Sequence, residues 1–153
     1  KQAAAMVRRK EKYLMNIVRS FMPDHGDFRP VDGMMSVAQQ VRHIALTVKW
    51  FREGAFGAGF DMDFGKLEAE NQRSVALDAS VKELEETYSA YTEFLGSLSA
   101  AELLAPMPPN AIFGEAPKMA VLSAGADHTA HHRGALSVYL RLLGITPVMV
   151  YTE

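Results

Sequence analysis

Hydrophobic side chains recur at intervals of three and four residues along most of the chain, which is the spacing of amphipathic α-helices. The predicted helices run from about Ala3 to Phe21, from the N-cap Ser36 to about Arg52, from Asp78 or Ser80 to about Leu98, and from about Lys118 to Leu143. Strand signals are nearly absent, since β-branched residues are sparse and no alternation of apolar and polar residues persists. The pattern therefore predicts an all-α protein built as a four-helix bundle.

The segments between these helices differ in length and composition. Residues 60–77 mix polar and apolar positions without a clear period, so we expect a long crossover connection between the second and third helices that contains a helical turn. Ser99 to Leu104 resembles one short extra turn, and residues 106–117 hold four prolines, which predicts an irregular loop. Gly54, Gly57 and Gly59 predict a loose exit from the second helix, and Gly144 predicts the end of the fourth.

Composition limits the classes of function that remain. A chain of 153 residues is the size of one ordinary domain, so residues 1–153 are expected to form a single domain. The formal net charge of −2 offers no positive field for nucleic acid or an anionic membrane surface, so neither is an expected partner. The apolar runs are too short to span a bilayer and the N-terminus shows no signal-peptide core, which predicts a cytoplasmic location.

The absence of cysteine narrows the chemistry further. It removes disulfides, thiolate metal ligands and cysteine nucleophiles together. Any metal site must therefore use histidine, aspartate or glutamate.

The fourth helix carries the strongest chemical signal. Seven residues follow one another along its expected inward face at steps of three and four: Val121, Gly125, His128, His132, Ala135, Tyr139 and Leu143. His128 and His132 lie one turn apart on that face, so both imidazoles can point at one shared atom. Zinc-protease helices use the same spacing, but Thr129 stands where the peptidase base would be, which excludes that class.

Two histidines bind a metal poorly, and catalytic sites of this type usually have three protein ligands and an open position. His43 in the second helix is the best third ligand, although it lies on a flank shared with Gln40 and Thr47. His25, in the first loop, is a weaker choice. His131 projects about 60° from His128 around the helix, so we expect it at the rim of the site.

A structural role for the histidines is the alternative to metal binding. His128 and His132 could be core residues with hydrogen-bond partners, and His43 and His131 could lie on the surface. Two adjacent imidazoles buried without partners would cost about 1 to 3 kcal/mol each, and a shared metal removes that penalty. Spacing alone leaves both interpretations open.

Two segments of the chain resemble a known family. The end of the chain, HTAHHRGALSVYLRLLGITP, resembles the closing motif of the DinB/YfiT-like metalloenzyme family, and MSVAQQVRHIALTVKWF resembles the family's motif around an isolated histidine. The resemblance covers essentially the whole chain. It implies a four-helix bundle with a long crossover and a metal site made by His43, His128 and His132.

The resemblance also implies a type of chemistry, with two departures. Relatives of known activity are S-transferases and isomerases that use a low-molecular-weight thiol, bacillithiol or mycothiol. The family often has glutamine where this chain has Ala135, and Asn-His-Glu where it reads Asp127-His128-Thr129, so the groups around the ligands differ. The leading hypothesis is a small-thiol-dependent transferase or isomerase that holds a divalent metal ion, zinc or nickel first, then iron or manganese.

Two other functions stay open. A metal-dependent hydrolase would need a general base, for which Asp127 is a candidate beside His128 and Glu11 or Glu93 could lie across the bundle. The third hypothesis is a non-catalytic metal-binding or stress-associated bundle. His131 and Asp127 are the candidate catalytic residues under either enzymatic hypothesis.

Aromatic and C-terminal residues suggest two further features. Five aromatic residues could line a substrate pocket, but helix stripes more often place such residues in the core: Tyr13, Trp50, Tyr88, Tyr91 and Tyr139. Val148, Met149, Val150 and Tyr151 could pack on a second subunit, which predicts a homodimer, or fold back over their own bundle.

Overall fold

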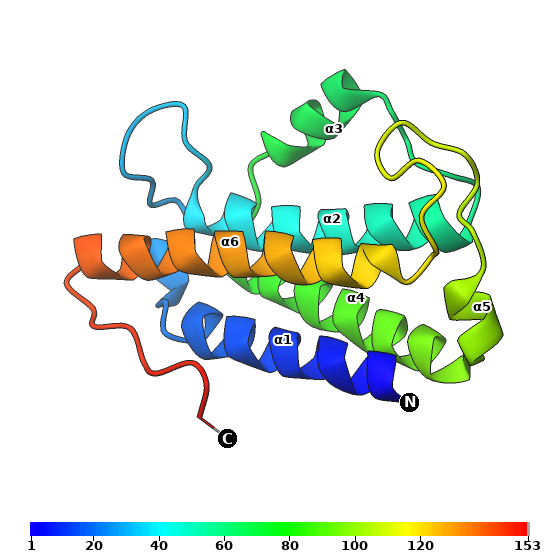
Figure 1. The fold of residues 1–153 in the computed structure, drawn as a ribbon. Coiled ribbons are helices and arrows are strands. Elements are labelled where there is room, and N and C mark those ends of the chain that lie inside the picture. The colour runs from blue at the N-terminus through cyan, green and yellow to red at the C-terminus, as the bar shows by residue number, and fades with distance from the viewer. Residues whose placement is uncertain (153) are drawn as a thin grey trace.

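The computed structural model describes residues 1–152, and these are all-helical with no β-strand among them (Figure 1). The elements in chain order are α1 (Gln2–Val18), the 3₁₀ helix η1 (Pro23–His25), α2 (Val37–Phe56), α3 (Phe64–Asn71), α4 (Leu77–Ser97), α5 (Ala100–Leu104) and α6 (Ala120–Leu142). The predicted fold class is confirmed: α1, α2, α4 and α6 form a four-helix bundle. The crossover from α2 to α4 is long, as expected, and contains α3.

The bundle core forms where the apolar stripes of the long helices meet. α4 buries Leu84, Tyr88, Tyr91 and Leu95, which follow one another at steps of three and four. Each of the other three helices adds fully buried aliphatic side chains, namely Leu14 and Ile17 from α1, Val41 and Ile44 from α2, and Leu136 and Leu140 from α6. None of the helices within residues 1–152 is long and apolar enough to cross a membrane.

The ends of α1 and α2 differ from the prediction. α1 ends at Val18, a turn before Phe21, because the next amides bond to carbonyls three residues back, Ser20 to Ile17 and Phe21 to Val18. α2 continues through Gly54 to Phe56 rather than ending near Arg52. Gly54 is buried there, and the ring of Phe60 packs against its backbone.

Three helix starts show how far capping can be read from sequence. Ser36 and Ser99 each accept a hydrogen bond from the backbone amide three residues further on, and the side chain of Gln39 or Glu102 completes each capping box. The N-cap at Ser36 is as predicted. The prediction for α4 was wrong, because its N-cap is Ala76 and has no side-chain hydrogen bond. Packing of the buried Leu77 at the first helical position, against Gly26, fixes that start instead.

The C-terminal segment folds back along its own bundle. Gly144 has φ +79°, a left-handed conformation that suits glycine, and it turns the chain after α6. Asn16 then donates to the Val150 carbonyl (3.0 Å), and the rings of Tyr13 and Tyr151 meet edge to face at 5.1 Å. The tail therefore takes the second of the two arrangements that the sequence allowed, and a homodimer stays a prediction.

Candidate metal centre

α6 carries two of the three histidines, as predicted. His132 is buried with 7% of its surface exposed, and His128, one turn earlier, is half-buried. The phase of the predicted stripe was partly wrong: Leu122, Thr129, Leu136 and Leu140 are buried, whereas Gly125, Ala135 and Leu143 are only half-buried. α6 packs against both α1 and α2, so its buried face is wider than one stripe and His128 lies at its edge.

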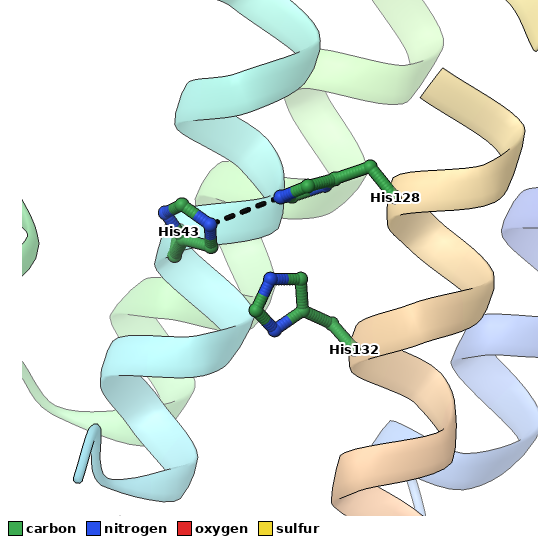
Figure 2. A group of neighbouring side chains, drawn as sticks. All are labelled: His43, His128 and His132. Atoms are coloured by element: carbon green, nitrogen blue, oxygen red, sulfur yellow. Dashed lines mark hydrogen bonds between the residues drawn. The ribbon is translucent and has the colours of Figure 1, made fainter. Parts of the chain in front are cut away.

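α2 brings His43 to the same place. The ligand nitrogens of His43, His128 and His132 lie within 4.8 Å of one another, and Nε2 of His43 is 3.0 Å from Nε2 of His128. Figure 2 shows the three rings converging across the space between α2 and α6. This is the only group of three such side chains found within residues 1–152. The spacing suits three nitrogens that share one metal ion.

Two amide side chains make hydrogen bonds to the Nδ1 atoms of His43 and His132, which we call the outer nitrogens of this group. Nδ1 of His43 lies 3.0 Å from Oδ1 of Asn71, and Nδ1 of His132 lies 3.0 Å from Oε1 of Gln40. An amide oxygen can only accept, so each Nδ1 carries the proton and each Nε2 keeps a lone pair. Histidines that bind metals are oriented in this way by a second hydrogen bond.

Burial keeps two of the imidazoles neutral. Desolvation, with the repulsion of the neighbouring imidazoles added, lowers the pKa of His128 to about 4 and that of His132 to about 3. Neither ring is protonated at neutral pH, and a neutral ring is the form that binds a metal.

The weaker candidates lie outside this group. His131 is exposed beside the group, and its ring centroid lies 4.9 Å from that of His132. Asp127 and Glu93 are exposed, and Glu11 lies on α1, where burial and the nearby Glu85 raise its pKa. His25 accepts a hydrogen bond from the Met22 amide in the loop after α1.

Gln40 and Asn71 were missed as site residues at the sequence level. Gln40 had a signal, because it shares the flank of α2 on which His43 lies. Asn71 had none, because it lies at the end of α3, in the segment without a clear period. Only the docking of α3 over α2 brings it to His43.

A groove of about 580 Å³ opens onto the histidines. It lies between α2 and the crossover that contains α3, and His43, Asn71 and His128 form one end. Trp50 lines it, while three of the other candidate aromatics, Tyr88, Tyr91 and Tyr139, are buried in the core. The core interpretation is therefore confirmed for these three tyrosines, and Trp50 is the one member of the set that lines this groove.

Comparisons with known proteins agree with this architecture. The model of the DinB family matches residues 1–153. The crystal structure of YjoA, a DinB-like protein from Bacillus subtilis, superposes with a TM-score of 0.73 at 19% sequence identity, covering 100% of this chain and 99% of the other. No curated protein matches the chain.

Proposed function

This chain belongs to the DinB family, and we propose that His43, His128 and His132 together hold one divalent metal ion that serves in catalysis. The observation that carries the proposal is the convergence of three histidine nitrogens within 4.8 Å. The outer nitrogens of His43 and His132 are already engaged, which leaves the inner ones for a ligand.

The donor set fits such an ion. Three neutral nitrogens without a carboxylate suit zinc or nickel, with iron or manganese as weaker choices. Three protein ligands also leave a coordination position for a substrate atom, as catalytic rather than structural zinc sites do. The groove reaches His43 and His128, so that position is accessible from outside.

The reaction that we propose is attack of a small thiolate on an electrophilic carbon, which forms a carbon–sulfur bond while the leaving group departs with the electron pair of the bond that breaks; an isomerisation assisted by the same thiol belongs to this class. A bound divalent ion would lower the pKa of a thiol so that it reacts as a thiolate near neutral pH. The chain has no cysteine, so the sulfur must come from a small molecule. The resemblance to thiol-dependent relatives supports this class over hydrolysis.

The protein's own side chains orient the histidine rings that would bind the ion. Asn71 and Gln40 fix the rings of His43 and His132 through their Nδ1 atoms. Nε2 of His128 lies 3.0 Å from Nε2 of His43, so both atoms would hold the ion only with the His128 ring in the tautomer that carries its proton on Nδ1.

The test is thiol consumption by zinc-loaded protein, with benzyl mercaptan as the thiol and 1-chloro-2,4-dinitrobenzene as the electrophile. We expect turnover above the uncatalysed rate, and its loss after chelation and in His132→Ala. Ester hydrolysis without thiol would favour the hydrolase instead. Bound zinc without turnover of either substrate would overturn the proposed catalysis and leave a non-catalytic metal protein.

A further inference from the structure

The groove beside the histidines combines a mainly apolar surface with charged residues along its border. Five apolar side chains contribute to that surface among charged and polar residues, with Leu46, Trp50 and Phe51 from α2 and Phe64 and Leu67 from α3. Phe64 is 55% exposed and lines the groove. At about 580 Å³ the groove falls within the size range of small-molecule sites, about 300 to 1,000 Å³.

The polar groups along the walls are largely engaged by the protein itself. The indole N–H of Trp50 donates to the Asp61 carbonyl at 2.8 Å, and the Thr47 hydroxyl donates to the His43 carbonyl at 2.9 Å. The Asn71 side-chain oxygen already serves His43. The walls therefore offer a ligand apolar contact rather than hydrogen-bond donors, and the inner histidine nitrogens are the polar end.

The charges around the groove disfavour an anion. The groove is bordered by one lysine, Lys49, and by four carboxylates, those of Glu53, Asp61, Glu68 and Glu70. Lys49 is paired with Glu83 at 2.7 Å. Asp61 and Glu70 also have cationic partners, but no arginine or lysine of the described residues pairs with Glu53 or Glu68. A ligand with its own negative charge would be repelled by the carboxylates of Glu53 and Glu68.

We infer that this groove takes the apolar body of the substrate, an aromatic or alkyl-bearing molecule without negative charge, and directs its one polar end to His43 and His128. The inference rests on the proposed function, because the histidines supply the reactive end. It narrows the substrate class, since it excludes an acidic thiol or electrophile whose charge would lie along α3.

Two dyes of the same ring skeleton test the inference. N-phenyl-1-naphthylamine is uncharged, and 1-anilinonaphthalene-8-sulfonate adds one negative charge. Both brighten in apolar surroundings, so emission gives each Kd on chelator-treated protein. Trp50 is the only tryptophan, so quenching of its emission reports binding at the groove wall. We expect the uncharged dye to bind tighter by about tenfold or more.

Matched variants locate the dye. Phe64→Ser and Leu67→Ser remove side chains from the groove wall and should raise the Kd of the uncharged dye about fivefold or more. Met62→Ser is the control, because Met62 is 44% exposed in the same connection but does not line the groove. It should leave the Kd unchanged.

The outcomes separate this inference from the proposed function. Equal affinity for the two dyes, or equal effects of Phe64→Ser and Met62→Ser, would overturn the substrate class even if zinc binds. Dye binding as expected, with no zinc bound in a parallel elemental analysis, would overturn the metal-dependent function and leave an apolar ligand site.

Discussion

Nε2 of His43 lies 3.0 Å from Nε2 of His128, although 85 positions separate the two residues in the chain. One of these nitrogens must carry a proton and the other a lone pair. Because Nδ1 of His43 donates to Asn71, the proton belongs to His128. The two nitrogens come together only because α2 and α6 pack side by side, and they would be shared by a metal ion only after the proton between them is lost.

Asn71 is expected to tune metal affinity without binding the metal. Asn71→Ala removes the acceptor that orients His43 and should weaken zinc binding about 10- to 100-fold. Asn71→Asp retains an acceptor and should restore most of the affinity. Competition with a chromophoric chelator measures the Kd. Gln72→Ala is the control, since the Gln72 side chain bonds to Glu68 on the exposed surface, and equal Kd values for Gln72→Ala and Asn71→Ala would contradict the assigned role.

The buried histidines predict how the stability of the metal-free protein depends on pH. Their folded-state pKa values, about 4 for His128 and about 3 for His132, lie below the ordinary 6.5. As the pH falls below 6.5 the unfolded chain takes up protons that the folded chain does not, so the free energy of unfolding decreases. The stabilisation is complete above pH 6.5 and is lost as the pH falls towards 4 and then 3.

Urea unfolding of chelator-treated protein across this window measures the effect. His132→Leu removes one of the two groups, so its free energy of unfolding should fall less steeply with decreasing pH than that of the unaltered chain. Parallel curves for the two proteins would contradict the assigned pKa shift of His132.

Gly54 and Gly96 should respond in opposite directions to alanine. A Cβ at Gly54 would collide with the Phe60 ring, which packs on Trp50, so Gly54→Ala should lower the free energy of unfolding by about 1 to 3 kcal/mol. Gly96 lies in α4, where an added Cβ would meet nothing within 4 Å, and Gly96→Ala should raise it by up to about 1 kcal/mol. Thermal or urea unfolding measures the free energy of unfolding of each variant. A Gly54→Ala protein as stable as the unaltered chain would show that Phe60 does not pack on α2 at this position.

Tyr151 is expected to anchor the C-terminal tail. Its ring meets Tyr13 and lies 5.5 Å from the Arg133 guanidinium, so Tyr151→Ala should cost about 0.5 to 1.5 kcal/mol of stability. Met149→Ala, at a position 67% exposed, should have no effect on the free energy of unfolding. A comparable loss of stability in Tyr151→Ala and Met149→Ala would show that the Tyr151 ring is not what anchors the tail. Light scattering on the same samples tests the predicted homodimer.

The helical period was sufficient to predict the bundle and two of the three histidines of the site. His128 and His132 share a face because four residues make about one turn, so their pairing follows from local geometry. The assignment of His43 to this pair rested mostly on the family resemblance, because its flank position does not select a partner helix. Ala76 as the N-cap of α4 was unpredictable from capping chemistry, since tertiary packing of Leu77 determines it.

The remaining features of the site depend on how the crossover docks. Asn71 reaches His43 because Arg42 donates to both the carbonyl and the side chain of Glu70, which fixes the end of α3 over α2. Phe64 and Leu67 form a groove wall only in that position. No local pattern in residues 60–77 encodes these contacts, so neither the groove nor the partner of His43 could be read from the sequence.

The metal content of protein purified without a histidine tag tests the central claim most directly. After loading with zinc and removal of the excess, elemental analysis should find about one ion per chain in the unaltered protein and in the controls His25→Ala and His131→Ala. His43→Ala, His128→Ala and His132→Ala should each lose most of it. An undiminished zinc content in these three variants, or no retained zinc in the unaltered protein, would contradict the three-histidine centre.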